Sequence, residues 1–318
     1  MAIIFNKSLL GRQSPVGRSE TRNCAILPTV FTAKNKGRPN QRRAAPGYIA
    51  HHTSNMPMHR FYISPESWDP RALILRGSEA HHARDVLRIK RGDRVVVFNG
   101  RGREVTAEIA DFARDEVHLR KLQENETPPL RSRITLGQAI PKRKNMDFIV
   151  QKAVEIGAAE IAPLISERTI VDLDAKEAEQ KRSKWQQIAI EAAKQCGQNW
   201  LPTVATPRNL KDFFEAATGP RPVSTSQSDV ATTFDLLLIG SLQPDALHLK
   251  HILSEFRERH GDRPQSVLMM VGPEGDFTPA ELALAKTQGC QPITLGPIIL
   301  RVETAAIYCL SVLSYELM

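Results

Sequence analysis

The sequence predicts an α/β protein in which a small β-barrel precedes a larger domain of alternating strands and helices. Short alternating runs between residues 58 and 126 have the length and β-branched content of strands. From residue 133 onward, apolar strands alternate with helical patterns. Near the carboxyl terminus, two apolar strands each run into a glycine and then into a helix start. Such strand ends form the usual ligand crevice of α/β proteins.

The net charge lies in the first 57 residues. The chain carries a formal net charge of +8, but nine of its 43 basic residues and one of its 35 acids fall in 1–57, so 34 of each remain in 58–318. We therefore expect residues 1–57 to be a disordered basic extension. Three interpretations fit it: a plastid or mitochondrial transit peptide, an RNA-gripping tail, or a start assigned too early, ahead of Met56 and Met58.

Composition indicates an ordinary soluble chain. Of 318 residues, 41% are hydrophobic and 25% are charged, and no apolar run reaches membrane-spanning length. The four cysteines lack both metal-ligand spacing and a disulfide framework. We therefore expect no metal, no membrane and a cytoplasmic setting, or a plastid or mitochondrion if residues 1–57 are a transit peptide.

The predicted barrel, residues 58–126, contains strands at 94–98, 104–109 and 116–122, with Asn99-Gly100 as a hairpin turn. One helix over 78–87, capped by Ser78, is expected before them. Cations exceed acids between residues 81 and 103, which indicates contacts with phosphates. The candidates are Arg84, Arg88 and Arg91. A solvated charged face is the alternative.

A linker at 127–132, broken by Pro128 and Pro129, leads into the second domain, residues 133–318. A strand at 134–139, a helix from Asn145 to Gly157 and a strand at 161–165 interrupted by Pro163 predict a parallel βαβ unit. The loop before this helix lies at a strand's carboxyl end and a helix's amino end. That position suits phosphate, or a solvated basic turn. Its cations are Lys142, Arg143 and Lys144.

A long helix over 176–196 has one apolar stripe, which places Cys196 in the core. Gln195 and Asn199 lie at its exit, where amides suit a base edge or the last helical carbonyls. A helix at 210–217, a mobile loop at 219–233, a strand at 236–240 and a helix at 248–259 are expected next.

Two strand-to-helix junctions close the chain. A strand at 267–271 meets Gly272, and Thr278, Pro279 and Glu281 then form a helix start with a cap, a first-turn proline and a capping-box acid. A second strand ends at Leu295-Gly296, ahead of a loop to residue 301 and a last helix. Neither a P-loop nor a dinucleotide-binding pattern occurs.

Four motifs carry a resemblance: PKRKNMDFIVQKAVEIGA, EAAKQCGQN, VGPEGDFTPAE and LGPIILRVETAA, in this order after a small barrel. Over residues 58–318 the chain resembles the ribosomal RNA small subunit methyltransferase E family. The resemblance implies a PUA-like RNA-binding barrel and a SPOUT methyltransferase domain with a carboxy-terminal trefoil knot. It also implies homodimers that methylate N3 of a uridine in 16S rRNA of the small ribosomal subunit with S-adenosylmethionine.

The resemblance further implies that the cofactor lies among three loops, whose residues here are Leu238, Ile239, Gly240, Val271, Gly272, Pro273, Glu274, Gly275, Leu295, Gly296, Leu300 and Arg301. Asp276 stands where many relatives have a second glycine, and Ile298 where many have arginine. The first departure bears on the loop's geometry, and the second removes a cation that RNA might otherwise contact.

Uracil N3 holds its proton near neutral pH, so methylation needs help with that proton or with the resulting anion. We expect Arg301 to face the negative charge, Glu303 to orient Arg301 or take the proton, and Thr304 to hold the loop. Alternatively, Arg301 and Glu303 pair only to hold the knot. Two other functions remain open: a non-catalytic rRNA-binding protein, and a SPOUT methyltransferase that acts on tRNA.

Overall fold

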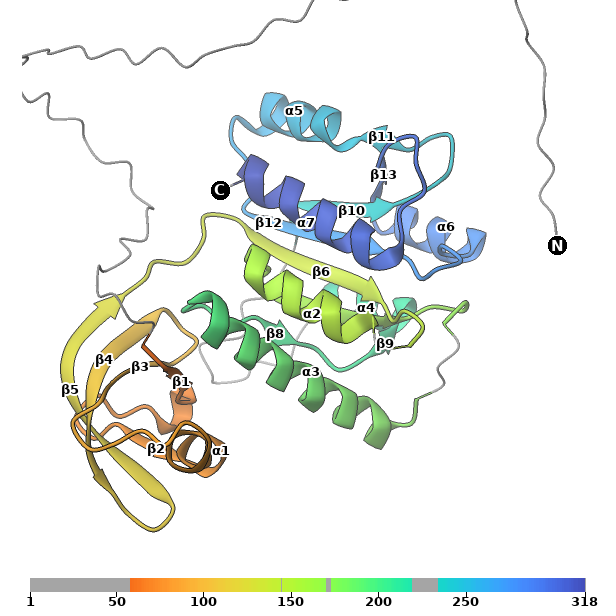
Figure 1. The fold of residues 1–318 in the computed structure, drawn as a ribbon. Helices are drawn as coiled ribbons and strands as arrows, with labels where there is room; N and C mark the ends of the chain where they lie inside the picture. The colour runs from red at the N-terminus through yellow and green to blue at the C-terminus, as the bar shows by residue number, and fades with distance from the viewer. Residues whose placement is uncertain (1–57, 144, 170–172, 219–233, 318) are drawn as a thin grey trace, which may run out of the picture. The chain divides into compact units, whose positions relative to one another are not determined.

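Two β-sheets of different kinds organise the fold (Figure 1). The computed structural model describes residues 58–143, 145–169, 173–218 and 234–317. The predictions for the 1–57 extension, for Lys144 and for the 219–233 loop lie outside these ranges. Within them, no helix is both long and apolar enough to cross a membrane.

The first sheet is a curled, PUA-like sheet of five strands in the order β1-β3-β4-β5-β2 (Figure 1). β1 pairs with β3 in parallel and the other pairs are antiparallel. The two end strands, β1 and β2, do not pair with each other, so the sheet does not close. The expected barrel is therefore an open half-barrel. Its strands are β1 (Arg60–Tyr62), β2 (Ile74–Arg76), β3 (Arg94–Phe98), β4 (Arg103–Phe112) and β5 (Glu116–Glu126).

The single helix expected over 78–87 is two shorter ones. After the turn η1 (Pro65–Ser67) and β2, the chain forms α1 (Gly77–His81) and then the π-helical turn η2 (His82–Val86). Arg76 holds the cap position and no side chain caps the helix, so the prediction that Ser78 caps it is wrong. Ala80 and Ala83 are buried against the sheet, and this contact holds the short segment in place.

The second sheet is parallel throughout, in the order β11-β13-β10-β12-β6-β7-β8, with β9 also on β7. Three two-residue strands were not expected: β8, β9 and β11. The strands are β6 (Arg133–Ala139), β7 (Glu160–Ile165), β8 (Thr203–Val204), β9 (Arg208–Asn209), β10 (Leu236–Gly240), β11 (Leu247–His248), β12 (Ser266–Val271) and β13 (Gln291–Thr294).

Pro163 does not interrupt β7, contrary to expectation. On its outer side, β7 pairs with β8 through Glu160 and Ile161, and with β9 through Leu164 and Ile165. Pro163 lies between these two pairings. The missing proline N–H therefore removes no ladder hydrogen bond on that side.

Helices cover both faces of the parallel sheet, and alternate residues of each strand pack against opposite layers. Val267, Met269 and Val271 of β12 share a core with the layer of α2, α3, α5 and α7, whereas Leu268 and Met270 share one with α4 and α6. The helices are α2 (Asn145–Ile156), α3 (Ala175–Cys196), α4 (Leu210–Thr218), α5 (Leu249–His260), α6 (Pro279–Thr287) and α7 (Val302–Leu317).

The hairpin between β3 and β4 packs against the residues that follow α3. Gly100 and Gly102 have φ of 70° and 86°, as the predicted turn requires. Leu201 N donates to the Gly100 carbonyl, and Gly102 N donates to the Asn199 carbonyl. A side-chain carbon at Gly102 would lie 2.6 Å from the Thr127 carbonyl oxygen, so only glycine fits there. Residues 55–318 form one compact unit.

The carboxy-terminal trefoil knot remains a prediction, because strand order alone does not define how the chain threads.

Candidate active site

The three loops expected to form one site follow three neighbouring parallel strands. β10 pairs with β12 on one side, Ile239 opposite Met270, and with β13 on the other, Gly240 opposite Ile293. Adjacent strands lie about 4.8 Å apart, so the segments that leave their carboxyl ends meet at one edge of the sheet. The structure thus brings together Leu238–Gly240, Val271–Gly275 and the segment after β13. That strand ends at Thr294, so Leu295 already belongs to the loop.

The loop between β12 and α6 is tight. A side-chain carbon added at Gly272 would lie 3.1 Å from the Asp276 Oδ1 atom and 3.2 Å from the Phe277 amide nitrogen. Asp276 has a φ of 62°, the left-handed conformation that glycine adopts most easily. Its carboxylate accepts a hydrogen bond from Phe277 N at 2.8 Å. Asp276 is thus held in a backbone conformation that glycine adopts more easily, and its own carboxylate bonds the next residue of the turn.

The predicted catalytic residues begin α7. Arg301 precedes the helix, and its carbonyl accepts from Ala305 N at 2.8 Å. Its exposed side chain makes no hydrogen bond or ion pair with another residue of the described ranges. Glu303 is half-buried. Its carboxylate accepts a hydrogen bond at 3.3 Å from the Nδ2 atom of Asn145, which is the first residue of α2. Glu303 is therefore held by Asn145 rather than by Arg301, and Thr304 is exposed beside it.

A buried amide lies under these two helix starts, and sequence reasoning missed it. Gln138, near the end of β6, is fully buried, and its Nε2 donates to the Ala139 carbonyl at 2.8 Å and toward the Val271 carbonyl at 3.5 Å. Its Oε1 atom is buried without a hydrogen-bond partner among the described residues. A polar residue within an otherwise apolar strand was the signal available in the sequence.

The basic loop after β6 reaches the same edge. Lys142 N donates to Glu274 Oε1 at 2.9 Å, which joins this loop to the β12–α6 loop. The side chains of Lys142 and Arg143 are exposed and make no ion pair with other described residues. Arg143 has a φ of 61°, so its backbone is in the left-handed region. The basic loop and the β12–α6 loop are therefore connected at this edge of the sheet.

Asn199 is engaged elsewhere. It is 7% exposed, its Oδ1 accepts from Arg60 Nη2 at 2.7 Å, and its Nδ2 donates to Thr127 Oγ1 at 2.9 Å. Arg60 belongs to the curled sheet and also bonds Glu104. Asn199 therefore joins the curled sheet to the second domain, and this placement argues against its expected contact with RNA.

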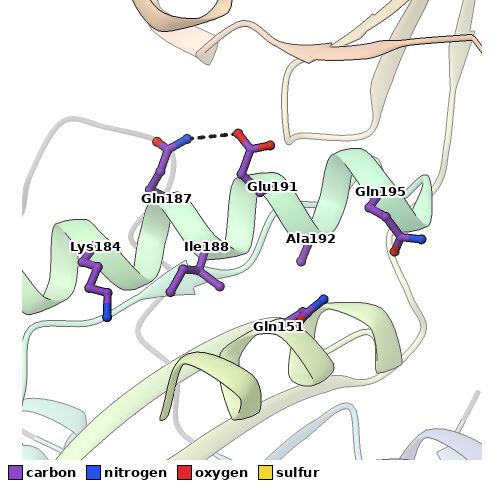
Figure 2. A pocket seen from close by; sticks show the side chains of 7 residues that line it. All are labelled: Gln151, Lys184, Gln187, Ile188, Glu191, Ala192 and Gln195. Atoms are coloured by element: carbon purple, nitrogen blue, oxygen red, sulfur yellow. Dashed lines mark hydrogen bonds between the residues drawn. The ribbon is translucent and has the colours of Figure 1, made fainter. Parts of the chain in front are cut away.

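Gln195 lies apart from the strand ends. It lines a surface cavity of about 450 Å³ between α2 and α3 (Figure 2). Gln187 donates to Glu191 at 3.2 Å, on the side of α3 away from Gln151 (Figure 2). The lining comes from α2 and α3 and from none of the three strand-end loops: Gln151, Lys184, Gln187, Ile188, Glu191, Ala192 and Gln195. Its apolar floor and amide rim make it a groove separate from the crevice.

The three arginines predicted in the curled sheet differ in their surroundings. Arg84 donates to both Asp85 carboxylate oxygens and to the Arg114 carbonyl. The Asp85 carboxylate raises the pKa of Arg84, and Arg84 lowers that of Asp85. Arg88 and Arg91 are exposed and make no ion pair with described residues. They are the freer pair for phosphates.

The three cysteines of the described ranges offer no nucleophile at this site. Cys196 is exposed at the end of α3, so the prediction that it lies in the core is wrong. Cys290 and Cys309 are buried, and burial raises the pKa of each thiol to about 12. Over the described ranges, no group of three or more His, Cys, Asp or Glu side chains is placed to hold a metal ion.

Two family matches cover these domains. Residues 75–122 match the RNA methyltransferase PUA domain, and residues 128–314 match the RNA methyltransferase domain. The chain thus combines a PUA-like sheet with a following parallel sheet whose strand-end loops lie at one edge. This combination and the two matches place it in the class of RNA methyltransferases.

Relatives and solved structures narrow the class. The chain is 31% identical to the ribosomal RNA small subunit methyltransferase E of Synechocystis, over 88% of this chain and 82% of the relative, and 30% identical to that of Bacillus subtilis, over 76% and 89%. The chain belongs to the ribosomal RNA small subunit methyltransferase E family.

Two similar solved structures hold the cofactor. The Neisseria gonorrhoeae member of the family, bound to S-adenosylmethionine, matches with a TM-score of 0.66 at 30% identity, over 82% of this chain and 98% of that one. A Legionella pneumophila methyltransferase with bound S-adenosylmethionine matches with a TM-score of 0.69 at 31% identity, over the same shares.

Proposed function

We propose that this chain methylates N3 of one uridine in the 16S rRNA of the small ribosomal subunit, in the cytoplasm and as a homodimer. The observation that carries the proposal is the convergence of three strand-end loops at one edge of the sheet, beside Arg301 at the start of α7. Family membership and the cofactor-bound relatives support it.

S-adenosylmethionine is the proposed methyl donor, and it supplies an electrophilic methyl group on a sulfonium. The residues present fit it. Strand ends expose backbone donors and acceptors for an adenosine. The tight turn after β12 leaves little room for a side-chain carbon at Gly272, where Asp276 and Phe277 lie close to the backbone. The binding set is that of the three loops: Leu238–Gly240, Val271–Gly275, Leu295, Gly296, Leu300 and Arg301.

The chain's own residues manage the charge on the uracil. Loss of the N3 proton spreads negative charge over N3, O2 and O4, and the free guanidinium of Arg301 stabilises this charge. Glu303, held by Asn145, accepts the proton. Thr304 holds the first turn of α7 in place. Lys142 and Arg143, with Lys144, bind rRNA phosphates near the crevice, and Arg88 and Arg91 bind them at the curled sheet.

Primer extension on 16S rRNA tests the proposal. A methyl group on N3 blocks base pairing, so reverse transcriptase stops at the modified nucleotide. We expect a single stop in cells that carry this gene and none in a deletion strain, with the stop restored by the wild-type gene and not by Arg301→Ala. A stop only in tRNA would favour the tRNA methyltransferase, and rRNA binding without any stop would favour the non-catalytic binding protein.

A further inference from the structure

Glu281 is a buried carboxylate with no part in the reaction described above. It is the third residue of α6 and is 6% exposed. It forms no ion pair with a cation of the described ranges. Three donors satisfy it instead: Thr278 N at 2.8 Å, Ser166 Oγ at 3.1 Å and Glu167 N at 2.9 Å. A buried charge needs such compensation, so these contacts are specific to the folded site.

Only the first of these bonds belongs to the capping box. In that motif the helix's third residue bonds the backbone N–H of the cap residue, here Thr278. The chain contains a second capping box at the start of α3, where Glu177 bonds Asp174 N at 3.2 Å. Glu177 is exposed, and this backbone hydrogen bond is the one that its carboxylate accepts from the described residues. The two extra bonds of Glu281 therefore serve something other than helix initiation.

The extra bonds reach a loop more than a hundred residues earlier in the chain. Ser166 and Glu167 follow β7 and lie 115 and 114 residues from Glu281. Their turn is closed by Thr169 N, which donates to the Ser166 carbonyl at 2.8 Å, and by Ser166 N, which donates to Thr169 Oγ1 at 3.1 Å. Glu281 thus fastens the first turn of α6, directly after the β12–α6 loop, to a separate, internally bonded turn.

The same turn holds the middle of the β12–α6 loop. Arg168 donates from Nη1 to the Gly275 carbonyl. A side-chain carbon at Gly275 would lie 3.2 Å from the Arg168 Cδ atom, so the two chains are in close contact. Ser166–Arg168 therefore contacts the loop at Gly275 and again at Glu281, on either side of the left-handed residue Asp276.

We propose that Glu281 is a positioning residue for the methyl donor. By binding Ser166 and Glu167, it fixes Gly272–Gly275 in the conformation whose backbone holds the donor. Glu281 itself touches neither donor nor RNA. This inference rests on the proposed function, because it assigns the donor to this loop.

Glu281→Gln and Glu177→Gln form a matched pair of variants of the full chain. Glutamine keeps the size of glutamate, but its NH₂ group faces donors and it loses the charge that strengthens these bonds. We expect calorimetry with S-adenosylmethionine to give a Kd about tenfold higher for Glu281→Gln, and within about twofold of wild type for Glu177→Gln. Ser166→Ala, which removes one of the three hydrogen-bond donors to Glu281, should raise this Kd about threefold.

Steady-state kinetics separate positioning from general damage. In Glu281→Gln, the KM for S-adenosylmethionine should rise about tenfold, while the KM for the small ribosomal subunit stays within about twofold. A variant that merely misfolds loses kcat without moving the two KM values apart. If Glu281→Gln fails to fold, Ser166→Ala with Ser166→Thr, which keeps the hydroxyl, carries the same test.

Equal donor affinity in wild type and in the Glu281 and Ser166 variants would overturn the inference and leave the proposed function standing. Equal weakening in Glu281→Gln and Glu177→Gln would also overturn it, because helix capping would then explain the effect. No donor binding by the wild-type chain, alone or with small ribosomal subunits, would refute both.

Discussion

The strand-end crevice and the curled sheet hold their cations in different surroundings. In the curled sheet, Arg84 is bonded to Asp85 and Arg60 to Glu104. In the crevice, Lys142, Arg143 and Arg301 make no ion pair with described residues. A paired arginine must give up its acid before it binds a phosphate, whereas an exposed cation gives up only water. The strand-end loops therefore leave these cations available for a ligand, whereas the curled sheet uses part of its own in the fold.

The largest expected effect comes from Arg301→Ala. If the guanidinium of Arg301 stabilises the uracil anion as proposed, its removal should lower the single-turnover rate by about 10²- to 10³-fold. Rapid-quench transfer of labelled methyl groups to small subunits measures it. Arg259→Ala is the control, because Arg259 is an exposed arginine on α5 that pairs with Glu255. A near-normal rate in Arg301→Ala would refute its catalytic role.

Loss of the cations in the basic loop after β6 should have the second largest effect. Lys142→Ala with Arg143→Gly removes two cations, and glycine suits the left-handed φ at 143. The backbone bond from Lys142 N to Glu274 survives both changes. We expect the KM for small subunits to rise about tenfold. The slope of log binding constant against log salt concentration should become shallower by about 1.4 to 1.8, because two phosphate contacts are lost. An unchanged slope would place RNA elsewhere.

Arginine substitutions in the curled-sheet domain should weaken RNA binding less, and by an amount that depends on whether the arginine forms an ion pair with an acid. Arg88→Gly with Arg91→Ala should weaken RNA binding about three- to fivefold, because both side chains are free of acids in the described structure. Glycine again suits position 88, where φ is 53°. Arg84→Ala serves as the control and should change binding less than twofold, since Arg84 is held by Asp85. Filter binding at several salt concentrations measures both. Equal losses would show that the pairing of Arg84 has no consequence.

The smallest effect concerns Asp276, the left-handed residue of the β12–α6 loop. Asp276→Ala should lower the free energy of unfolding by about 1 kcal/mol, because alanine tolerates a φ of 62° poorly. Asp276→Gly should stay within about 0.5 kcal/mol of wild type, since relief of strain offsets the lost bond to Phe277 N. Urea unfolding followed by circular dichroism compares the two. A more stable alanine variant would contradict the role assigned to this backbone conformation.

Local sequence signals predicted the elements that depend on neighbouring residues. β3 and β10 lie at the predicted bounds, Arg94–Phe98 and Leu236–Gly240. Thr278 caps α6, with Pro279 first and Glu281 completing the capping box, as expected. These features involve hydrogen bonds and apolar periods within about four residues, so the sequence carries them directly.

The roles of particular polar residues were less predictable. The sequence placed Asn199 among RNA contacts, yet its amide bonds Arg60 and Thr127. The predicted strand at 134–139 includes Gln138 without a role of its own, and the structure shows its side chain as a buried amide near the end of β6. An amide at a helix exit or in a strand has several partners within reach, and only the packing of distant segments selects among them.

By itself, the sequence determined the α/β class, the order of the two domains, the glycine-rich strand ends and, through four motifs, the family. The tertiary structure alone decided that β10 lies between β12 and β13, that Glu303 meets Asn145, and that Glu281 bonds Ser166 and Glu167. Periodicity and caps report on a few residues at a time. Contacts across more than a hundred residues arise only when whole elements pack.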